Sequence, residues 1–531
     1  MRRWNGWGDD GIDNTPPEGG IDFIASKVGK SVGFADAPMD ACVAAVGQSR
    51  LDDWCGLDTS AKTRLLHARG QSYPDWLAMR YGRMGPFPDA VARPECHEDV
   101  VALIREASKR GTIVIPYGGG TSVVGHLDVP TDDRPVLSID MGAMSRLLDL
   151  DETTRLARFG AGAPGPVLES QLRAAGYVLG HYPQSFEYST VGGWIVTRSS
   201  GQQSLRYGRI EQLFAGGRLV APAGELEIPT IPASSAGPDL RELLMGSEGR
   251  MGIVSEAQVR VRPIPEHEAF HAVFFGDWES AVNGVRAIAQ AKLPLSMLRL
   301  SNARETETQL MLAGHAGMIG TLEKYLRIRG QDKGKCMLLM GVTGTRRECS
   351  YARSAAFSLA RQNGGVHVGK QVGKGWSKSR FMGPYLRNSL WSEGYGADTV
   401  ETCVDWTRVT STMHAIEKAA EDAFAEFDER VHAFTHLSHV YPQGSSIYST
   451  FVFRATGDYE QDYARWKHLK KTLSETIVKH GGTISHQHGV GSDHKPYLPA
   501  EKGGEFGLNP MRAAFKCFDP DGLMNPGKLL D

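Results

Sequence analysis

The sequence predicts an α+β protein of more than one domain, and three observations support that prediction. The chain has 531 residues, which is more than one hydrophobic core usually accommodates. Residues 86 to 265 run strand, loop, strand, strand, helix, strand, an order that indicates mixed sheets rather than a doubly wound one. Residues 266 to 480 show strands separated by amphipathic helices, which is typical of an antiparallel sheet covered by helices.

Composition narrows the class of protein. The hydrophobic content of 41%, the charged content of 23% and the formal net charge of -2 are those of a globular protein, and they favour no nucleic-acid partner. The seven cysteines form no CxxC motif, which indicates a reducing compartment. The start of the chain has no apolar signal region, and no apolar run is long enough to span a bilayer. We therefore expect a cytoplasmic protein.

The first 265 residues are predicted in two parts. Residues 1–85 read as a helical lead-in that ends with a helix over Ala61–Arg69. Residues 86–265 begin with a helix over His97–Arg110, whose residues Val100, Ile104 and Ala107 share one face and which Gly111 ends. The other elements predicted in this part are strands at Thr112–Ile115, Val136–Ile139 and Leu156–Phe159, and a helix at Pro166–Ala175.

Residues 266–480 are predicted as a second domain that holds the substrate. Its strands are expected at Phe270–Phe275, Met337–Val342 and Ser446–Arg454, and its helices at Trp278–Lys292, Tyr351–Asn363, Thr410–Phe427 and Asp458–His480. Residues 481–531 end in a turn-rich stretch. We expect that stretch to return to the first domain.

The most informative motif is Pro116-Tyr117-Gly118-Gly119-Gly120-Thr121-Ser122, directly after a predicted strand. Consecutive glycines leave room for a ligand against the backbone and permit positive φ, so that successive N–H groups can converge on one anion. The motif is neither GxGxxG nor a Walker A loop, because it lacks the glycine spacing of the first and the GK[ST] ending of the second. It predicts a loop that holds a pyrophosphate, hence a dinucleotide, although the three glycines alone also fit an ordinary turn between strands.

Further segments combine small, polar and aromatic residues. Two lie at Gln184–Trp194 and Thr197–Gly201, and a third runs from Met245 to Ala257. A fourth, Thr483–Gly491, contains His486 and His488, which would point the same way if the segment were extended. Each of these segments, taken alone, also fits an ordinary connection between elements.

Together and in this order, these segments resemble the FAD-binding proteins of the vanillyl-alcohol-oxidase type, also called the PCMH-type FAD-binding family. Within it the chain is most similar to the alkyldihydroxyacetonephosphate synthases, flavoenzymes of ether-lipid synthesis. The resemblance runs from Trp4-Asn5-Gly6-Trp7-Gly8 to Asn525-Pro526-Gly527-Lys528-Leu529. It implies a two-subdomain FAD-binding domain with a cap domain, a small-molecule lipid substrate, a homodimer and peripheral contact with a membrane.

The resemblance also implies where FAD binds. The expected cofactor residues are Pro116, Tyr117, Gly118, Gly119, Gly120, Thr121, Ser122, Gln184, Ser185, Phe186, Glu187, Tyr188, Ser189, Thr190, Thr197, Arg198, Ser199, Ser200, Glu248, Gly249, Arg250, Met251, Gly252, Ile253 and Val254. Some relatives attach the flavin through a histidine of the glycine loop. Gly118–Ser122 contains none, so the FAD is expected to be noncovalent.

For catalysis, the resemblance implies Tyr448, His486 and His488, with Arg387 on the substrate phosphate and Arg299 also needed. It implies that the acyl group of acyl-dihydroxyacetone phosphate is exchanged for a fatty alcohol, through an adduct at flavin N5 and without net redox. Tyr448 would accept a proton if its pKa were lowered. The chain departs from the synthases where Gln487 replaces the middle of three histidines.

Two other functions stay open. One is an FAD-linked oxidase or dehydrogenase of a 2-hydroxy acid or related alcohol, some of which place a divalent metal on a cap-domain histidine pair and a Glu-His-Gly segment. Here His436, His439, Gln487 and His488 lie in comparable places, but glutamine replaces an anionic ligand poorly. We therefore expect no metal, without excluding one on His436 and His439. The other function is a non-catalytic flavin-bound protein.

Overall fold

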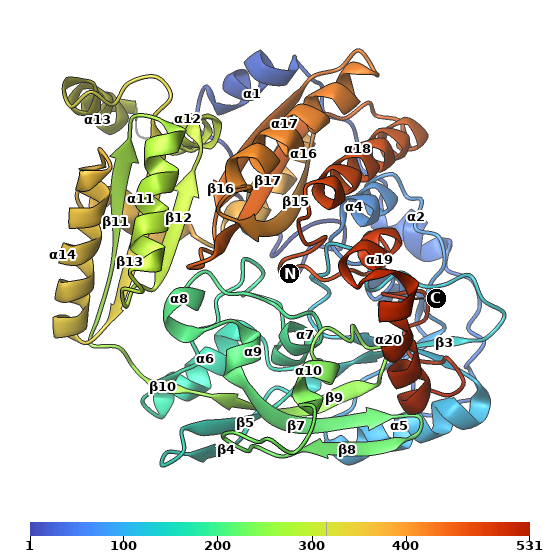
Figure 1. Ribbon diagram of the computed structural model, residues 1–531. Coiled ribbons are helices and arrows are strands. Elements are labelled where there is room, and N and C mark those ends of the chain that lie inside the picture. The colour runs from blue at the N-terminus through green and yellow to red at the C-terminus, as the bar shows by residue number, and fades with distance from the viewer. Residues whose placement is uncertain (315, 531) are drawn as a thin grey trace.

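The computed structural model describes residues 1–314 and 316–530 (Figure 1). A parallel three-stranded sheet opens the FAD-binding part in the order β1 (Ala90–Ala92), β3 (Val136–Asp140), β2 (Ile113–Tyr117). Helix α5 (His97–Arg110) has the predicted bounds and ends at Gly111, whose φ of 64° is the left-handed value that favours glycine. The glycine loop follows β2, as the sequence predicts.

A second sheet of this part has five antiparallel strands. Their order is β4 (Leu147–Asp151), β5 (Leu156–Gly160), β9 (Ile253–Arg260), β7 (Phe214–Ala221), β8 (Gly224–Ile228). Helices α6 (Gly165–Ala174), α7 (Val191–Val196), α8 (Ser204–Tyr207), α9 (Ile210–Leu213) and α10 (Leu240–Leu244) lie between these strands in sequence. The strands at 214–228 were not predicted, because glycines interrupt their apolar pattern.

The cap contains one antiparallel seven-stranded sheet, which confirms the predicted architecture. Its order is β14 (Val366–His367), β11 (His267–Phe275), β13 (Cys336–Gly344), β12 (Met297–Ser301), β16 (Val431–Leu437), β17 (Gly444–Arg454), β15 (Tyr395–Asp405). A two-stranded pair joins β6 (Tyr177–Val178) of the FAD-binding part to β10 (Arg262–Pro263), which lies just before the cap in sequence. Strands β12, β15 and β16, which carry Arg299, Glu401 and His436, were not predicted, whereas β17, which carries Tyr448, was.

Helices flank the cap sheet (Figure 1). They are α11 (Trp278–Gln290), α12 (Ala303–Leu312), α13 (Ala316–Ile328), α14 (Arg346–Gln362), α15 (Gln371–Ser379), α16 (Gly383–Ser392), α17 (Val409–Ala425) and α18 (Tyr459–Lys479). The predicted helices at 278–292, 410–427 and 458–480 differ from these by no more than two residues at either end. Helix α14 starts five residues before the predicted 351, because Thr345 and Glu348 form a capping box there.

The N-terminal residues form short helices and contact the cap. Four short helices, α1 (Gly20–Val28), α2 (Met39–Ala44), α3 (Ala61–Leu66) and α4 (Tyr73–Arg80), are joined by irregular chain. Ile24 and Val28 of α1 pack with Val452 of the cap. The Trp7 backbone exchanges two hydrogen bonds with the Asn388 side chain, at 3.1 and 2.9 Å. These contacts make the segment part of the cap's surroundings.

The two halves share a core. One hydrophobic cluster contains Phe159 and Trp194 from the FAD-binding part together with Phe275, Ile447 and Phe453 from the cap. A continuous apolar interface of this kind fixes the halves relative to one another. The chain end, which includes α19 (Leu498–Glu501) and α20 (Gly504–Phe518), then returns to the first sheet, where Val114 N donates to Leu523 O at 2.8 Å. Among the described residues, no helix has the length and apolar character needed to cross a bilayer.

Candidate active site

The glycine loop is shaped by the segment that packs on it. A Cβ on Gly118 would lie 2.5 Å from Thr190 Oγ1, and one on Gly119 would overlap the backbone oxygen of Tyr188. Only Gly120 has positive φ, at 62°. The glycines therefore permit close packing of residues 188–190 at two positions, and the expected left-handed conformation occurs at one.

The same loop fits a pyrophosphate. The backbone N–H groups of Gly119, Gly120 and Thr121 donate to no acceptor in the described part of the chain. The Ser122 hydroxyl, which the sequence suggested as a ligand donor, is instead 2.8 Å from His126 Nδ1 and accepts from the His126 N–H at 3.1 Å. The anion site would thus consist of backbone amides, as in other phosphate nests.

The polar side chains of the second segment mostly hold the protein together. Gln184 Nε2 donates to Arg380 O at 2.8 Å, and Ser189 Oγ accepts from the Trp194 indole at 2.7 Å. Arg198, one of the expected cofactor residues, lies 2.9 Å from Glu242 and 3.4 Å from Glu211. Its charge is already matched by two carboxylates. This segment therefore contributes to a cofactor site mainly through its backbone.

Glu248 ties three segments of the expected cofactor site together. Its backbone has a φ of 52°, uncommon for a residue with a side chain. Its carboxylate accepts from Val490 N at 2.5 Å and Gly491 N at 2.8 Å, and lies 3.1 Å from His126 Nε2. Its backbone oxygen accepts from Asn525 Nδ2 at 2.8 Å. The neighbouring Ser247 hydroxyl is buried without a hydrogen-bond partner among the described residues, so it could serve a ligand.

Tyr448 lies where three parts of the chain converge. It is on β17, its ring stacks on His436 of β16 at a centroid distance of 4.9 Å, and His488 approaches its ring at 5.7 Å, nearly perpendicular. Its hydroxyl donates to Thr399 Oγ1 at 3.3 Å. Burial raises the pKa of Tyr448 to about 12, so the side chain is a neutral phenol near pH 7. The lowered pKa that a base would need is absent.

His488 is placed by a carboxylate. Glu401 lies opposite Tyr448 in the β15–β17 register. Its Oε1 accepts from the backbone N–H groups of Gln487 at 2.7 Å and His488 at 2.6 Å, and lies 3.5 Å from His488 Nδ1. Burial lowers the pKa of His488, although the Glu401 charge opposes that effect. The result is a neutral imidazole whose protonated form would have a carboxylate beside it.

His486 points elsewhere, so the expectation that both histidines share one direction is wrong. Residues 481–494 form an irregular loop rather than an extended strand. His486 stacks on His439 at 5.1 Å, and its Nε2 lies 2.7 Å from both Arg209 Nη1 and Tyr441 Oη. Arginine can only donate, which leaves the proton of the neutral ring on Nδ1. Burial, reinforced by the Arg209 charge, holds the pKa of His486 well below its usual value.

The two predicted substrate arginines have different surroundings. Arg299 Nη2 lies 2.7 Å from Glu305 Oε1 and 3.1 Å from His436 Nδ1, which itself is 3.0 Å from Glu305. Arg299 is thus paired with a carboxylate. Arg387 donates to the backbone oxygens of Gln71 at 2.7 Å and Ala397 at 3.1 Å.

One nitrogen of Arg387 remains unpaired. Its guanidinium lies over Trp76 at 4.3 Å, and its Nη2 has no hydrogen-bond partner among the described residues. Burial lowers the pKa of Arg387, which still leaves it charged. Of the two arginines, Arg387 is therefore the one with a donor to offer to an anion.

The histidines considered as metal ligands are engaged separately. His439 Nδ1 lies 3.2 Å from Ser200 Oγ and 3.1 Å from Ser204 Oγ, while His436 contacts Glu305. Burial lowers the pKa of His439 to about 3. Within residues 1–314 and 316–530, no three His, Cys, Asp or Glu side chains are grouped so that they could hold a metal ion. Gln487 adds no anionic ligand.

Sequence reasoning missed Glu305, Glu401 and Arg209, which position the predicted histidines. Glu305 and Glu401 are almost completely buried. The available signal was weak, because a glutamate in a helix or strand looks solvated until its neighbours are known. The register that places Glu401 opposite Tyr448 joins residues 47 positions apart.

Comparisons with known proteins identify the family of the chain. Two family models match, "FAD binding domain" over residues 88–228 and "FAD linked oxidases, C-terminal domain" over residues 264–529. The chain is 32% identical over 480 residues to the alkyldihydroxyacetonephosphate synthase of Dictyostelium discoideum, across 88% of this chain and 77% of that protein. It is 30% identical over 570 residues to the synthase of Trypanosoma brucei brucei, across 99% and 92%. A solved alkyldihydroxyacetonephosphate synthase structure superposes with a TM-score of 0.86 at 27% identity, across 99% and 98%.

Proposed function

The chain belongs to the alkyldihydroxyacetonephosphate synthase family of FAD-dependent enzymes, and we propose that it exchanges the acyl group of acyl-dihydroxyacetone phosphate for a fatty alcohol. C1 of the substrate loses a proton, and its bond to the acyl oxygen breaks to release a fatty acid. The alcohol oxygen then bonds to C1 and loses its own proton, and C1 regains one. The observation that favours this reaction is the convergence of Tyr448, His488 and Glu401.

FAD is the cofactor of this family, and several residues of this chain fit it. The unused amides of Gly119, Gly120 and Thr121 would hold the pyrophosphate, with the Ser247 hydroxyl as a further donor. When bound, FAD supplies a ring system that can accept and return an electron pair. The glycine loop contains no histidine, which supports noncovalent binding.

We assign substrate phosphate binding to Arg387. Two of its nitrogens are fixed by backbone oxygens and a third is unpaired, so the guanidinium is oriented before an anion arrives. Arg299 differs, because Glu305 already neutralises it. We therefore propose that Arg299 acts through Glu305 to hold His436 against the Tyr448 ring.

We assign removal of the C1 proton to His488 rather than to Tyr448. A neutral imidazole can accept a proton, and Glu401 beside it would stabilise the imidazolium that results. Tyr448, a phenol with a pKa of about 12, suits hydrogen-bond donation to a substrate oxygen. His486 would present its Nδ1–H to the alcohol or to charge at C1, held there by Arg209.

The experiment is a paired assay on the FAD-loaded protein. One reaction receives palmitoyl-dihydroxyacetone phosphate and hexadecanol, and the other receives a panel of 2-hydroxy acids with a redox dye. Ether product and free palmitate without sustained dye reduction support the synthase. Dye reduction by a hydroxy acid without ether product would replace it with the oxidoreductase, and neither reaction would favour a non-catalytic protein.

A matched pair of variants tests the residues. Tyr448→Phe is expected to lower ether formation about 100-fold while leaving the flavin absorbance unchanged. Tyr463→Phe is the control, because Tyr463 stacks on Tyr459 and Trp466 and, among the described residues, makes no ring contact with Tyr448, His436 or His488. Homodimerisation and peripheral contact with a membrane belong to the same proposal on family grounds. Light scattering and vesicle sedimentation test them.

A further inference from the structure

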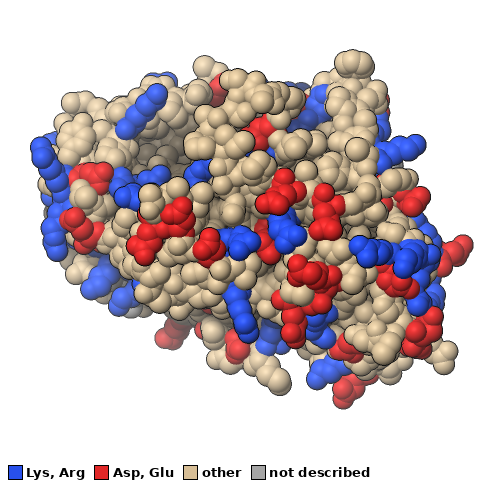
Figure 2. Space-filling model, turned by 90° about the horizontal axis from the view of Figure 1, so that it is seen from below, with Lys and Arg blue, Asp and Glu red and all other residues tan. Residues whose placement is uncertain are grey.

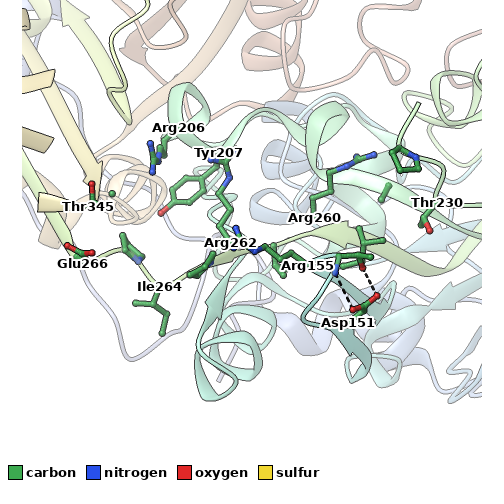
Figure 3. Close-up of a pocket in the computed structure, with 18 of the residues that line it drawn as sticks. Asp151, Arg155, Arg206, Tyr207, Thr230, Arg260, Arg262, Ile264, Glu266 and Thr345 are labelled. Atoms are coloured by element: carbon green, nitrogen blue, oxygen red, sulfur yellow. Dashed lines mark hydrogen bonds between the residues drawn. The ribbon is translucent and has the colours of Figure 1, made fainter. Parts of the chain in front are cut away.

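A cavity of about 740 Å³ lies apart from Tyr448, His488 and the glycine loop (Figure 3). It is bounded by the β4–β5 turn, the end of β9 with β10, and α8, near the junction of the two halves. Its volume is within the usual range of small-molecule sites. None of the residues assigned above to cofactor, substrate or catalysis lines it.

Four arginines line this cavity, Arg155, Arg206, Arg260 and Arg262, against two carboxylates. Arg206 is paired with Glu348 at 3.2 Å, and Arg260 Nη1 donates to Phe214 O at 2.7 Å. Neither Arg155 nor Arg262 forms an ion pair with any carboxylate in the described residues. The two arginines come from neighbouring backbone segments, because Val261 N donates to Arg155 O at 3.0 Å, and both are labelled in Figure 3.

The two carboxylates of the cavity are occupied elsewhere. The Asp151 carboxylate accepts from Thr153 N at 2.8 Å and Thr154 Oγ1 at 2.7 Å, so its hydrogen bonds are made within the β4–β5 turn. Glu266 Oε2 accepts from Arg346 N at 3.2 Å, and Figure 3 places it at the opposite end from Asp151. The centre of the cavity therefore has an excess of positive charge. Burial and the nearby Arg206 charge lower the pKa of Arg262, which is the effect that a bound anion would reverse.

Apolar side chains border the same cavity. Ile231 is 49% exposed and Ile264 is 42% exposed, unusually high for isoleucine, and both line it beside Pro232, Pro263 and Pro265. The aromatic ring in the wall, Tyr207, is only 5% exposed, which leaves little face for a nucleotide base to stack on. Cationic groups with exposed apolar neighbours match an anionic head that carries a hydrocarbon chain.

We propose that this cavity binds an anionic amphiphile, with a phosphate monoester head on Arg155 and Arg262 and an acyl or alkyl chain over Ile264. Such a ligand can come from a membrane surface or as a free lipid. Seen from below in Figure 2, the protein has a hollow toward the left that Lys and Arg side chains border, with mixed charge elsewhere. The site is independent of turnover, so it goes beyond the proposed function.

The test compares two double variants of the FAD-loaded protein. Arg155→Gln with Arg262→Gln removes the unpaired charges, and Arg105→Gln with Arg347→Gln removes two exposed arginines that do not line the cavity. Calorimetry measures binding of dihexanoyl phosphatidate as the free lipid, with dihexanoyl phosphatidylcholine as the zwitterionic comparison. Sedimentation with phosphatidate-containing vesicles measures the surface-bound form.

The expected result is that the cavity variant loses one phosphatidate site, or binds it at least 10-fold more weakly, while the control variant matches the wild type. Loss in calorimetry indicates a free lipid, and loss in sedimentation alone indicates a membrane surface; either supports the cavity. Equal binding by both variants, or no phosphatidate binding by the wild type in either measurement, would overturn it. Synthase activity on a soluble short-chain substrate should be the same in both double variants. Absence of that activity in the wild type would refute the proposed function without bearing on the cavity.

Discussion

Replacement of Glu401 tests how the His488 loop is held. The Glu401 carboxylate accepts two short backbone hydrogen bonds, from Gln487 and His488, and a longer one from Ser485 Oγ at 3.3 Å. Its side chain is 4% exposed, so water cannot easily replace it. Glu401→Ala leaves these donors without an acceptor. Glu401→Gln keeps an oxygen but removes the charge.

The magnitude follows from the bonds lost. A hydrogen bond to a charged group contributes about 1.5–3 kcal/mol, so loss of the two short bonds should cost about 3–6 kcal/mol in the alanine variant. Charge-assisted bonds are roughly twice as strong as neutral ones, so the glutamine variant should lose about half of that. A loop displaced by about 1 Å can reduce the rate about 100-fold. We expect such a decrease in kcat/KM for Glu401→Ala and a smaller one for Glu401→Gln.

Urea unfolding followed by circular dichroism measures the stability, and ether formation from palmitoyl-dihydroxyacetone phosphate measures kcat/KM. Glu393→Ala serves as the control, because Glu393 is exposed at the end of α16. Flavin absorbance at saturating FAD shows whether the cofactor site survives. If Glu401→Ala unfolds at the wild-type urea concentration and keeps wild-type kcat/KM, the hydrogen bonds of Glu401 to Gln487 and His488 do not hold the loop in its active position.

Three further substitutions have defined outcomes. Gly119→Ala should lower FAD affinity at least 100-fold, because the added Cβ would overlap the backbone oxygen of Tyr188. Gly47→Ala is the control, because a Cβ there has no neighbour within 4 Å and should leave FAD affinity unchanged. Flavin titration measures both affinities. Arg209→Lys should lower kcat/KM about 10–100-fold by releasing His486, and wild-type kinetics would contradict this. Burial raises the pKa of Asp493 to about 7, so its protonated form stabilises the fold at low pH and that stability is lost as pH rises from about 4 to 7. Asp493→Asn should therefore gain about 2 kcal/mol over the wild type between pH 5 and pH 8, and an equal difference at both pH values would exclude the effect.

The fold could be predicted where the pattern is local. Helix α5 follows from the spacing of Val100, Ile104 and Ala107 and from the glycine that ends it. The glycine loop follows from three residues without side chains after an apolar strand. Strands β7 and β8 could not be found this way, since their glycines and charges are compatible with strand only once β7 lies between β9 and β8 in the sheet.

The sequence by itself determined which chemical groups are present, namely a glycine loop for a dinucleotide, a tyrosine, two histidines near the chain end and two arginines. Tertiary structure decided what each group does. Burial keeps Tyr448 a phenol, Glu305 neutralises Arg299, and Arg209 and Glu401 turn His486 and His488 toward different partners. The physical reason is that charge state and orientation depend on dielectric surroundings and on neighbours hundreds of residues away, such as Arg209 for His486. The spacing of residues along the chain determines neither charge state nor orientation.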